Sequence, residues 1–275
     1  MSKQALNLEK LMYKSRKIKI HIINMIYQAN SGHPAGSLGL ADLFSYLYFH
    51  HLNHHPSMAD REQRDRLLLS NGHVCPVWYA SLAESGYFSP NLLSSFRQLN
   101  SPLQGHPVLN SIEGIENTSG SLGHGLSQAV GIAIGLKMNN QHSHVYCVMS
   151  DGEQQAGQTW EAYMLGYKYR LDNLIGIIDR NQIQIEGQTE EVMPIEPLVY
   201  KLMNFGWHVF EVDAHNFLEL DRVFNEAKKI DDRPSVIIAN TIPGKGVSFM
   251  EHNHHWHGKV PSEEEYQSAI YELEN

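Results

Sequence analysis

Two short stretches decide the fold: VMSDGE at residues 148–153 and DRNQI at residues 179–183. Each stretch begins where an apolar run typical of a buried strand comes to its end, and a helix-length segment separates the two runs. This arrangement predicts a βαβ unit within a parallel sheet. Ligands of open parallel sheets collect beyond the carboxyl ends of the strands, so we expect Asp151 and Asn181 to emerge side by side on that edge.

The polar residues after the two runs indicate a magnesium site for a diphosphate. Magnesium takes hard oxygen ligands in octahedral geometry, usually one or two from protein side chains and the rest from phosphates and water. The Asp151 carboxylate, the Asn181 amide oxygen and a nearby main-chain carbonyl fit this demand. The alternative at this point is that Asp-Gly and Arg-Asn are ordinary turn residues between a strand and a loop.

Composition favours one large α/β domain over two small ones. The chain has 275 residues, of which 42% are hydrophobic and 19% charged, as in globular proteins with a substantial core. Its net charge of −9 argues against a nucleic-acid binder, because phosphate contacts need a basic surface. Cys75 and Cys147 match no disulfide framework or cysteine zinc pattern. With no signal sequence or membrane span in view, we expect no membrane association and a cytoplasmic protein.

The rest of the chain alternates between helical and strand patterns. This alternation predicts an α/β fold with a mostly parallel sheet and helices on both of its faces. The helix of residues 121–138 is apolar nearly all round, so we expect it to be deeply buried. The predicted helices are residues 8–30, 41–52, 121–138 and 217–229 and a last helix from Ser262, and the predicted strands are residues 66–70, 144–149, 174–178, 207–212 and 235–240.

A glycine-rich segment, TSGSLG at residues 118–123, opens the third of these helices. Main-chain amides at the amino end of a helix are free to bind an anion. Glycine also lets the main chain approach phosphate oxygens closely. This segment is therefore a second candidate for diphosphate binding.

Six motifs, in sequence order, together resemble the amino-terminal part of transketolases. The resemblance covers essentially the whole chain and is strongest to the amino-terminal subunit of split transketolases, so it implies the diphosphate-binding domain of a thiamine-diphosphate-binding fold. The motifs are SGHP at 31–34, SNGH at 70–73, GHP at 105–107, GSLG at 120–123, the Asp-Gly to Asn pair of Asp151 and Asn181, and WHG at 256–258.

The resemblance assigns roles to individual residues. It implies a metal held by Asp151, Asn181 and the carbonyl of Ile183, with Mg²⁺ as the ion and Ca²⁺ or Mn²⁺ as substitutes. It also implies thiamine diphosphate as the cofactor. The residues that would approach this cofactor are Gly152, Asn181, His73 and the turn of Gly120, Ser121 and Leu122.

The 17 histidines fall into two groups. By resemblance, His33, His106 and His257 would contact donor hydroxyls, and His73 the cofactor and substrate side, since neutral imidazole exchanges protons near physiological pH. The others are read as structural or solvated. Among them, His50, His51, His54 and His55 are read as surface residues, and His252, His254 and His255 as a chance metal-binding group.

The function implied is transfer of a two-carbon ketol unit from a ketose to an aldose, with phosphorylated pentoses and hexoses as the default sugars. Residues 1–275 would form a single diphosphate domain. The pyrimidine domain of full-length relatives would lie on a partner, the carboxy-terminal transketolase subunit, in an assembly of two of each chain.

Two departures from the family pattern bear on this reading. Ser150 replaces a common glycine, which is a mild change, and Ala156 replaces a glutamate that helps link the two cofactor sites in relatives. Ala156 supports a rival interpretation, that of a non-catalytic assembly protein. A different thiamine diphosphate enzyme, of the 2-oxo acid dehydrogenase or deoxyxylulose-phosphate synthase type, is a second rival, and a histidine-rich metallohydrolase is a third.

Overall fold

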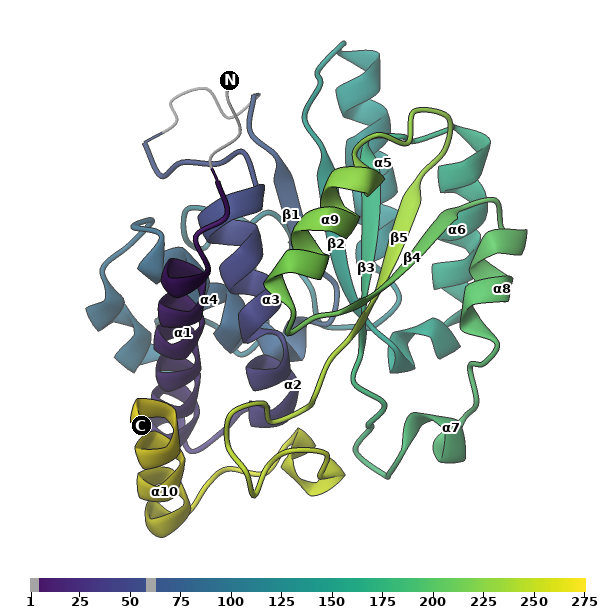
Figure 1. Cartoon of the computed structure of the whole chain (residues 1–275). Coiled ribbons are helices and arrows are strands. Elements are labelled where there is room, and N and C mark those ends of the chain that lie inside the picture. The colour runs from purple at the N-terminus through teal and green to yellow at the C-terminus, as the bar shows by residue number, and fades with distance from the viewer. Residues whose placement is uncertain (1–4, 58–62) are drawn as a thin grey trace.

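The computed structural model describes residues 5–57 and 63–275. In this part of the chain, five parallel strands form one sheet in the order β1-β2-β3-β5-β4 (Figure 1). All four neighbouring pairs run parallel, so the predicted parallel α/β sheet is confirmed. The strands are Arg66–Leu69 (β1), Val145–Ser150 (β2), Leu174–Arg180 (β3), His208–Asp213 (β4) and Ser235–Asn240 (β5).

Two of the three interior strands, β2 and β3, are buried along their whole length. Their apolar runs are continuous because helices cover a parallel sheet on both sides. The pairing of β2 with β3 ends at Ser150 opposite Asp179. The segments that follow these two strands therefore leave the sheet next to each other, as the sequence predicts.

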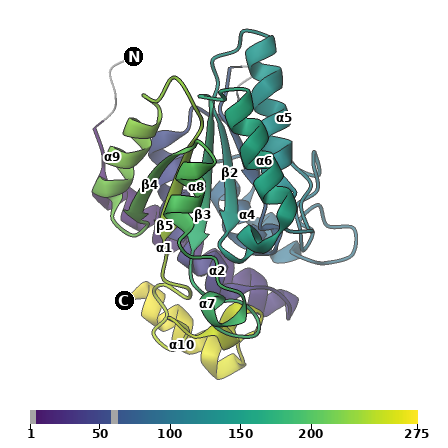
Figure 2. The same ribbon diagram turned by 90° about the vertical axis from the view of Figure 1, so that its right-hand side faces the viewer.

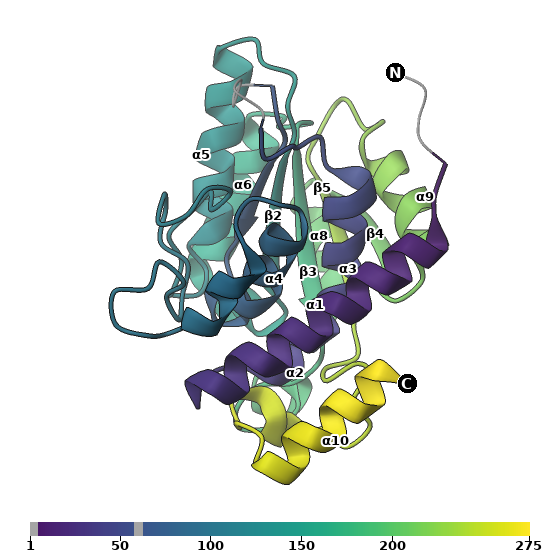
Figure 3. The same cartoon turned by 90° about the vertical axis from the view of Figure 1, so that its left-hand side faces the viewer.

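Successive side chains of a strand point to opposite faces, and each face of this sheet meets its own apolar core. Tyr146 and Val148 belong to the core beneath α1 (Leu8–Ala29), α3 (Ala41–Tyr46), α4 (Cys75–Glu84) and α9 (Phe217–Ala227). Cys147 and Met149 belong to the core beneath α5 (Gly125–Met138), α6 (Gly157–Lys168) and α8 (Leu198–Asn204). Figures 2 and 3 show these two helical layers on opposite sides of the sheet. The predicted cover of helices on both faces is confirmed.

The helices keep close to the predicted positions, with additions. α2, α4, α7 and α8 were not singled out in the sequence, and the predicted helix at 41–52 is α3 continued by a π-helical turn at Leu47–His51. The α-helices are Leu8–Ala29 (α1), Pro34–Gly39 (α2), Ala41–Tyr46 (α3), Cys75–Glu84 (α4), Gly125–Met138 (α5), Gly157–Lys168 (α6), Thr189–Val192 (α7), Leu198–Asn204 (α8), Phe217–Ala227 (α9) and Glu263–Glu274 (α10).

Local sequence sets both ends of α1. The Asn7 side chain accepts a hydrogen bond from the Lys10 amide at 3.0 Å, which satisfies one of the free amides of the first turn. Asn30 ends the helix in the left-handed conformation, with φ of 46°, as asparagine often does. The buried stripe packs on the core with Leu11, Ile18, Ile22, Met25 and Ile26.

The prediction for α5 is wrong in two respects. The helix begins at Gly125 rather than at residue 121, because Gly123 adopts a positive φ of 86° and ends a separate turn. The helix is also not deeply buried all round. Gly131 has no described atom within 4 Å of the place where a Cβ would stand, the same holds for Gly135, and Met138 is 78% exposed. One apolar side of α5 is thus left uncovered by the described part of the single chain.

Three histidines read as surface residues are instead packed and hydrogen-bonded. His50 Nε2 lies 3.1 Å from Asp221 Oδ1, and His51 Nε2 lies 2.9 Å from the Tyr146 hydroxyl. His54 Nε2 lies 2.7 Å from the Tyr48 carbonyl oxygen. The reason is the π-helical turn and the segment after it, which fold back onto the aromatic side chains of the core.

Neither cysteine is bonded to another. Cys75 and Cys147 are both free and buried, and burial raises the pKa of the Cys75 thiol to about 12. Across the described residues, no helix combines the length and the apolar character that a membrane crossing requires.

Candidate functional site

A cavity of about 360 Å³ lies at the carboxyl ends of β2 and β3. This is the end of the sheet at which α2 and α7 lie, at the bottom of Figure 1. Its walls come from seven separate parts of the chain, which meet only in the folded protein. The lining residues are His33, His73, His106, Gly120, Leu122, Ser150, Asp151, Gly152, Gln155, Asn181, Ile183, Gln184, Ile185, Glu186 and His257.

Of the residues that the sequence and the resemblance proposed, all but one line this cavity. The exception is Ser121, which is exposed and does not contribute to the wall. Its neighbours Gly120 and Leu122 do contribute. The structure therefore brings the motifs together in one place, and whether each residue performs its assigned role stays a prediction.

Three of the four motif histidines form a compact group of rings. The ring centres of His33 and His73 are 5.0 Å apart, those of His33 and His257 5.6 Å, and those of His73 and His257 5.3 Å. His106 lies in the wall of the same cavity. His33 stands at the amino end of α2, His73 in a 3-10 turn after β1, and His257 in a 3-10 turn near the carboxyl terminus.

These imidazoles are neutral at physiological pH. Burial lowers the pKa of His33 to about 4, with help from His257, Arg97 and His106. Burial is also the main cause that lowers the pKa of His73, of His106 and of His257. The buried Nδ1 of His33 has no hydrogen-bond partner in the described residues. A neutral ring with a free nitrogen can accept or donate a proton at a bound hydroxyl group.

Asp151 directs its carboxylate to several donors at the start of the loop after β2. Oδ1 accepts a hydrogen bond from the Gly152 amide at 2.7 Å. Oδ2 accepts from the Gln182 amide at 2.8 Å, from Arg180 Nη1 at 2.8 Å and from the Thr189 hydroxyl at 3.2 Å. Oδ1 thus keeps room for a further ligand.

The Asn181 amide is fixed in one orientation by its neighbours. Its Nδ2 donates to Asp179 Oδ2 at 2.8 Å, and its Oδ1 accepts from the Ile183 amide at 3.0 Å. Asp179 in turn accepts a hydrogen bond from the Thr241 hydroxyl. Because the nitrogen is engaged by a carboxylate, the amide oxygen is the atom offered on the cavity side.

The Ile183 carbonyl is a third available oxygen. Ile183 faces Gln188 in an antiparallel bridge whose hydrogen bonds run from the Thr189 amide to the Gln182 carbonyl and from the Gln184 amide to the Gly187 carbonyl. Ile183 is therefore the non-hydrogen-bonded member, with its own main-chain groups turned away from the bridge. Within the described residues, no hydrogen bond reaches its carbonyl oxygen.

The charges around these oxygens also fit a cation. Burial is the main cause that raises the pKa of Asp179 to about 7, and the charge of Asp151 adds to the rise. Burial raises the pKa of Asp151 as well, although Arg180 opposes the shift. A divalent ion among these groups would stabilise both buried carboxylates in the ionised form. The donor set of carboxylate, amide and carbonyl oxygens thus fits Mg²⁺ or Ca²⁺.

Glu153 is a structural member of the site that sequence reasoning missed. Its Oε1 accepts hydrogen bonds from the Gly123 amide at 2.6 Å and from the Ser70 hydroxyl, and its Oε2 accepts from the Ser150 amide at 3.2 Å. One buried carboxylate therefore joins the end of β1, the end of β2 and the glycine turn. The signal available was its place in the stretch VMSDGE, directly after Asp151 and Gly152.

Two more residues were missed. Arg180, the last residue of β3, pairs with Asp151 as well as with Glu190 and Glu196. Gln184 places its Nε2 2.7 Å from where a Cβ on Gly152 would stand. Arg180 belongs to the stretch DRNQI and Gln184 directly follows it, but the pattern does not show which way their side chains point.

The glutamate replaced by Ala156 would stand next to the glycine turn. A Cβ added at Gly123 would lie 2.7 Å from the Ala156 Cβ. Since Gly123 also has a φ of 86°, the position excludes a side chain for two independent reasons. The small Ala156 side chain is thus part of the packing beneath the turn.

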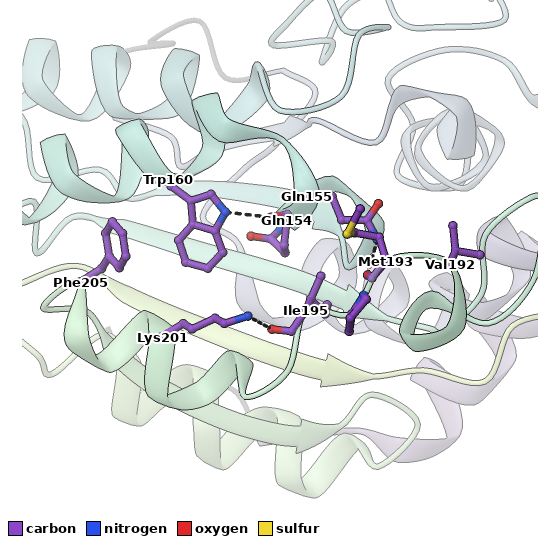
Figure 4. Close-up of a pocket in the computed structure, with 9 residues that line it drawn as sticks. Gln154, Gln155, Trp160, Val192, Met193, Ile195, Lys201 and Phe205 are labelled. Carbon is purple, nitrogen blue, oxygen red and sulfur yellow. Dashed lines mark hydrogen bonds between the residues drawn. The ribbon is translucent and has the colours of Figure 1, made fainter.

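A larger cavity, of about 670 Å³, lies beside the site (Figure 4). Its lining is mainly apolar, with Trp160 of α6, residues 192–195 and Phe205 at the end of α8. Lys201, the charged residue of this lining, donates a hydrogen bond to the Ile195 carbonyl at 2.7 Å. The cavity shares Gln155 with the smaller one. None of the described residues that line it carries a carboxylate or an imidazole, so the chemistry belongs to the smaller cavity.

The described residues contain no set of ligands for the metal site of a metallohydrolase. Among residues 5–57 and 63–275, no group of three or more His, Cys, Asp or Glu side chains is placed to hold a metal ion. The oxygen set of Asp151, Asn181 and Ile183 is of a different kind, since it has only one such side chain.

Comparisons with known proteins show which family the chain resembles. The family model described as "Transketolase, thiamine diphosphate binding domain" matches residues 12–273. The chain is 37% identical to an apulose-4-phosphate transketolase subunit of Phocaeicola vulgatus, over 98% of this chain and 95% of that protein. It is 39% identical to the 6-deoxy-6-sulfo-D-fructose transketolase subunit SqwG of a Clostridium species, over 100% and 98%.

Solved structures of transketolases are similar to this chain over nearly its whole length. The transketolase of Campylobacter jejuni superposes with a TM-score of 0.92 at 34% identity and covers 98% of this chain. This chain spans 43% of that transketolase, which is less than half of its length. The chain therefore belongs to the transketolase family of enzymes, of which it carries the thiamine diphosphate binding domain.

Proposed function

We propose that the chain is the amino-terminal, diphosphate-binding subunit of a two-chain transketolase, which transfers a two-carbon ketol unit from a ketose to an aldose. The observation that carries this proposal is a single cavity in which neutral histidines face the oxygen set of Asp151, Asn181 and Ile183. Relatives of nearly the same length are named as transketolase subunits, which supports a partner chain.

The cofactor of this reaction is thiamine diphosphate with Mg²⁺, for which Ca²⁺ or Mn²⁺ can substitute. Asp151 Oδ1, Asn181 Oδ1 and the Ile183 carbonyl would hold the metal. The main chain at Gly120, Leu122 and Gly152 would approach the diphosphate. When bound, thiamine diphosphate supplies the carbon nucleophile that adds to the ketose carbonyl.

The chain's own residues orient the sugar and move protons. Protons at the hydroxyl groups of donor and acceptor would be accepted and returned by His33, His106 and His257. His73 would contact the cofactor and the side of the sugar next to it. His33 and His73 are partly buried, which would limit the access of water to the hydroxyls that change protonation.

The rest of the enzyme would come from a partner, the carboxy-terminal transketolase subunit that carries the pyrimidine domain. Residues 1–275 would act as one domain, in an assembly of two of each chain. Two relatives are named for sugars that carry a phosphate or a sulfonate. We therefore propose a ketose with an anionic group far from its carbonyl as the donor. The buried free thiols of Cys75 and Cys147 support a reducing, cytoplasmic location.

The deciding experiment reconstitutes the chain with its carboxy-terminal subunit, thiamine diphosphate and Mg²⁺. The complex is given ketose phosphates, a sulfonated ketose or pyruvate together with an aldose phosphate, and the products are identified by mass spectrometry. We expect a product two carbons longer than the acceptor. Decarboxylation of pyruvate without ketol transfer would contradict the proposal, and so would partner binding that is indifferent to thiamine diphosphate in calorimetry.

Two substitutions separate cofactor binding from proton transfer. We expect Asp151→Ala to abolish Mg²⁺-dependent binding of thiamine diphosphate in the complex, because it removes the charged ligand. We expect His257→Ala to leave that binding in place and to lower turnover about 100-fold, within the range for a lost proton-transfer group. Calorimetry and steady-state kinetics measure the two effects, and Asp172→Ala, at the far end of the sheet, is the control for the first. Unchanged cofactor affinity in Asp151→Ala would refute the metal site.

A further inference from the structure

Asp151 presents two unlike carboxylate oxygens. Its Oδ2 accepts three hydrogen bonds, from Arg180 Nη1 and the Gln182 amide at 2.8 Å each and from the Thr189 hydroxyl at 3.2 Å. Its Oδ1 accepts one, from the Gly152 amide at 2.7 Å. The side chain is almost fully buried. Oδ2 is therefore the more occupied oxygen, with Arg180 as its one charged donor, whereas Oδ1 has one donor and a free lone pair.

Two glutamates fix the position of the Arg180 side chain. Its Nη2 donates to Glu190 Oε1 at 2.9 Å and to Glu196 Oε1 at 3.0 Å, and its side chain is only 8% exposed. The planar guanidinium can make these contacts at once because its donors form a rigid fork. The two glutamates, in α7 and in the segment before α8, therefore keep the guanidinium on Oδ2.

We propose that Arg180 determines the metal preference of this site, by keeping Asp151 a single-oxygen ligand and so favouring Mg²⁺ over Ca²⁺. The inference rests on the metal site proposed above. Arg180 acts through Asp151 and is a positioning residue, since it would touch neither substrate nor cofactor.

The chemistry of the two ions gives the reason. Mg²⁺ demands near-ideal octahedral geometry and takes one oxygen from a carboxylate, whereas Ca²⁺ takes six to eight oxygens and readily accepts both oxygens of one carboxylate. Blocking Oδ2 removes the two-oxygen mode, which costs Ca²⁺ a ligand and Mg²⁺ none. The positive charge of Arg180 repels both ions equally, because both carry the same charge. The ratio of the two affinities therefore reports geometry alone.

The test measures this ratio in the complex of the chain with its carboxy-terminal subunit. Calorimetry of thiamine diphosphate binding at stepped MgCl₂ or CaCl₂ concentrations gives the Kd of each ion without any turnover. Arg180→Lys keeps the charge without the fork, and Arg180→Gln removes the charge. Glu196→Gln leaves Arg180 in place but loosens it, and it covers the case in which an Arg180 variant does not fold. Arg222→Lys, on the surface of α9, is the matched control.

We expect both Arg180 variants to shift the Kd ratio about tenfold toward Ca²⁺, in line with the loss of an outer-shell partner of a metal ligand. Glu196→Gln should shift it in the same direction by less, and Arg222→Lys not at all. If the Kd ratio is unchanged in both Arg180 variants, the inference is overturned while the metal site stands. The same holds if only Arg180→Gln shifts the ratio and Arg180→Lys keeps the wild-type value. Cofactor binding by the wild type that needs no divalent ion would instead refute the site itself.

Discussion

The neutral state of the site histidines results from burial and not from a partner carboxylate. His33, His73 and His257 lie with ring centres 5.0 to 5.6 Å apart, and protonation of any one of them raises the cost of charging the others. For His33 the largest cause of its lowered pKa is burial, and the charges of His257, Arg97 and His106 follow. The site therefore keeps its imidazoles unprotonated and able to accept protons. The same burial makes the folded chain less stable at acid pH.

This arrangement predicts how stability depends on pH. The pKa of His33 falls from an ordinary 6.5 to about 4 on folding, so between these values the unfolded chain takes up a proton that the folded chain refuses. The free energy of unfolding should thus decrease as pH falls from about 6.5 to 4, with His33 contributing roughly 3 kcal/mol of the loss.

The measurement is urea unfolding of the isolated chain at pH 7, 5.5 and 4.5. His33→Asn should flatten the decrease relative to wild type, because asparagine does not titrate. His255→Asn, at an exposed histidine, should leave the slope unchanged. Equal slopes for His33→Asn and wild type would show that the buried cluster is not what titrates.

At the scale of elements, the turn of residues 118–123 depends on one carboxylate. Glu153 receives the Gly123 amide, the Ser150 amide and the Ser70 hydroxyl, and the Ser70 oxygen in turn accepts from the Gly125 amide at 2.9 Å. Strands β1 and β2, the turn and the start of α5 thus share a single buried anchor. Burial raises the pKa of Glu153, whereas the hydrogen bonds from its three donors favour the ionised carboxylate.

We expect Glu153→Gln to destabilise the chain by about 1 to 3 kcal/mol, since one amide NH₂ must then face a main-chain donor in a buried place. The turn should loosen, and the affinity of the complex for thiamine diphosphate should fall with it. Urea unfolding and calorimetry measure the two effects. Glu161→Gln, an exposed change on α6, is the matched control. Full stability together with full affinity in Glu153→Gln would mean that the turn does not need the carboxylate.

Strand ends were the part of the site that the sequence could predict. Asp151 and Asn181 each follow a continuous apolar run, and parallel pairing alone brings such residues together. Glu153 and Arg180 could not be assigned in the same way. Their partners lie on distant segments, and a residue at a strand end can point to either face or into the loop. The late start of α5 was missed for a local reason, because Gly123 takes a φ that the apolar pattern does not encode.

For the whole molecule, the uncovered side of α5 is the candidate contact surface for the proposed assembly. Gly131 and Gly135 are one helical turn apart, with no described atom within 4 Å of either missing Cβ, and the exposed Met138 continues the same side. Glycine in the middle of a helix costs about 1 kcal/mol relative to alanine. Two such residues on an open apolar face fit a surface to which a second chain comes close.

Substitutions at Gly131 test this surface from both directions. Gly131→Ala should stabilise the isolated chain by about 1 kcal/mol, because the helix gains propensity without a clash. Gly131→Glu should keep the fold but prevent formation of the proposed two-plus-two complex, because a charged side chain would stand in the contact. Analytical ultracentrifugation of the chain with its carboxy-terminal subunit measures the assembly. If Gly131→Glu assembles like wild type, the chains meet elsewhere, and the two glycines need another explanation.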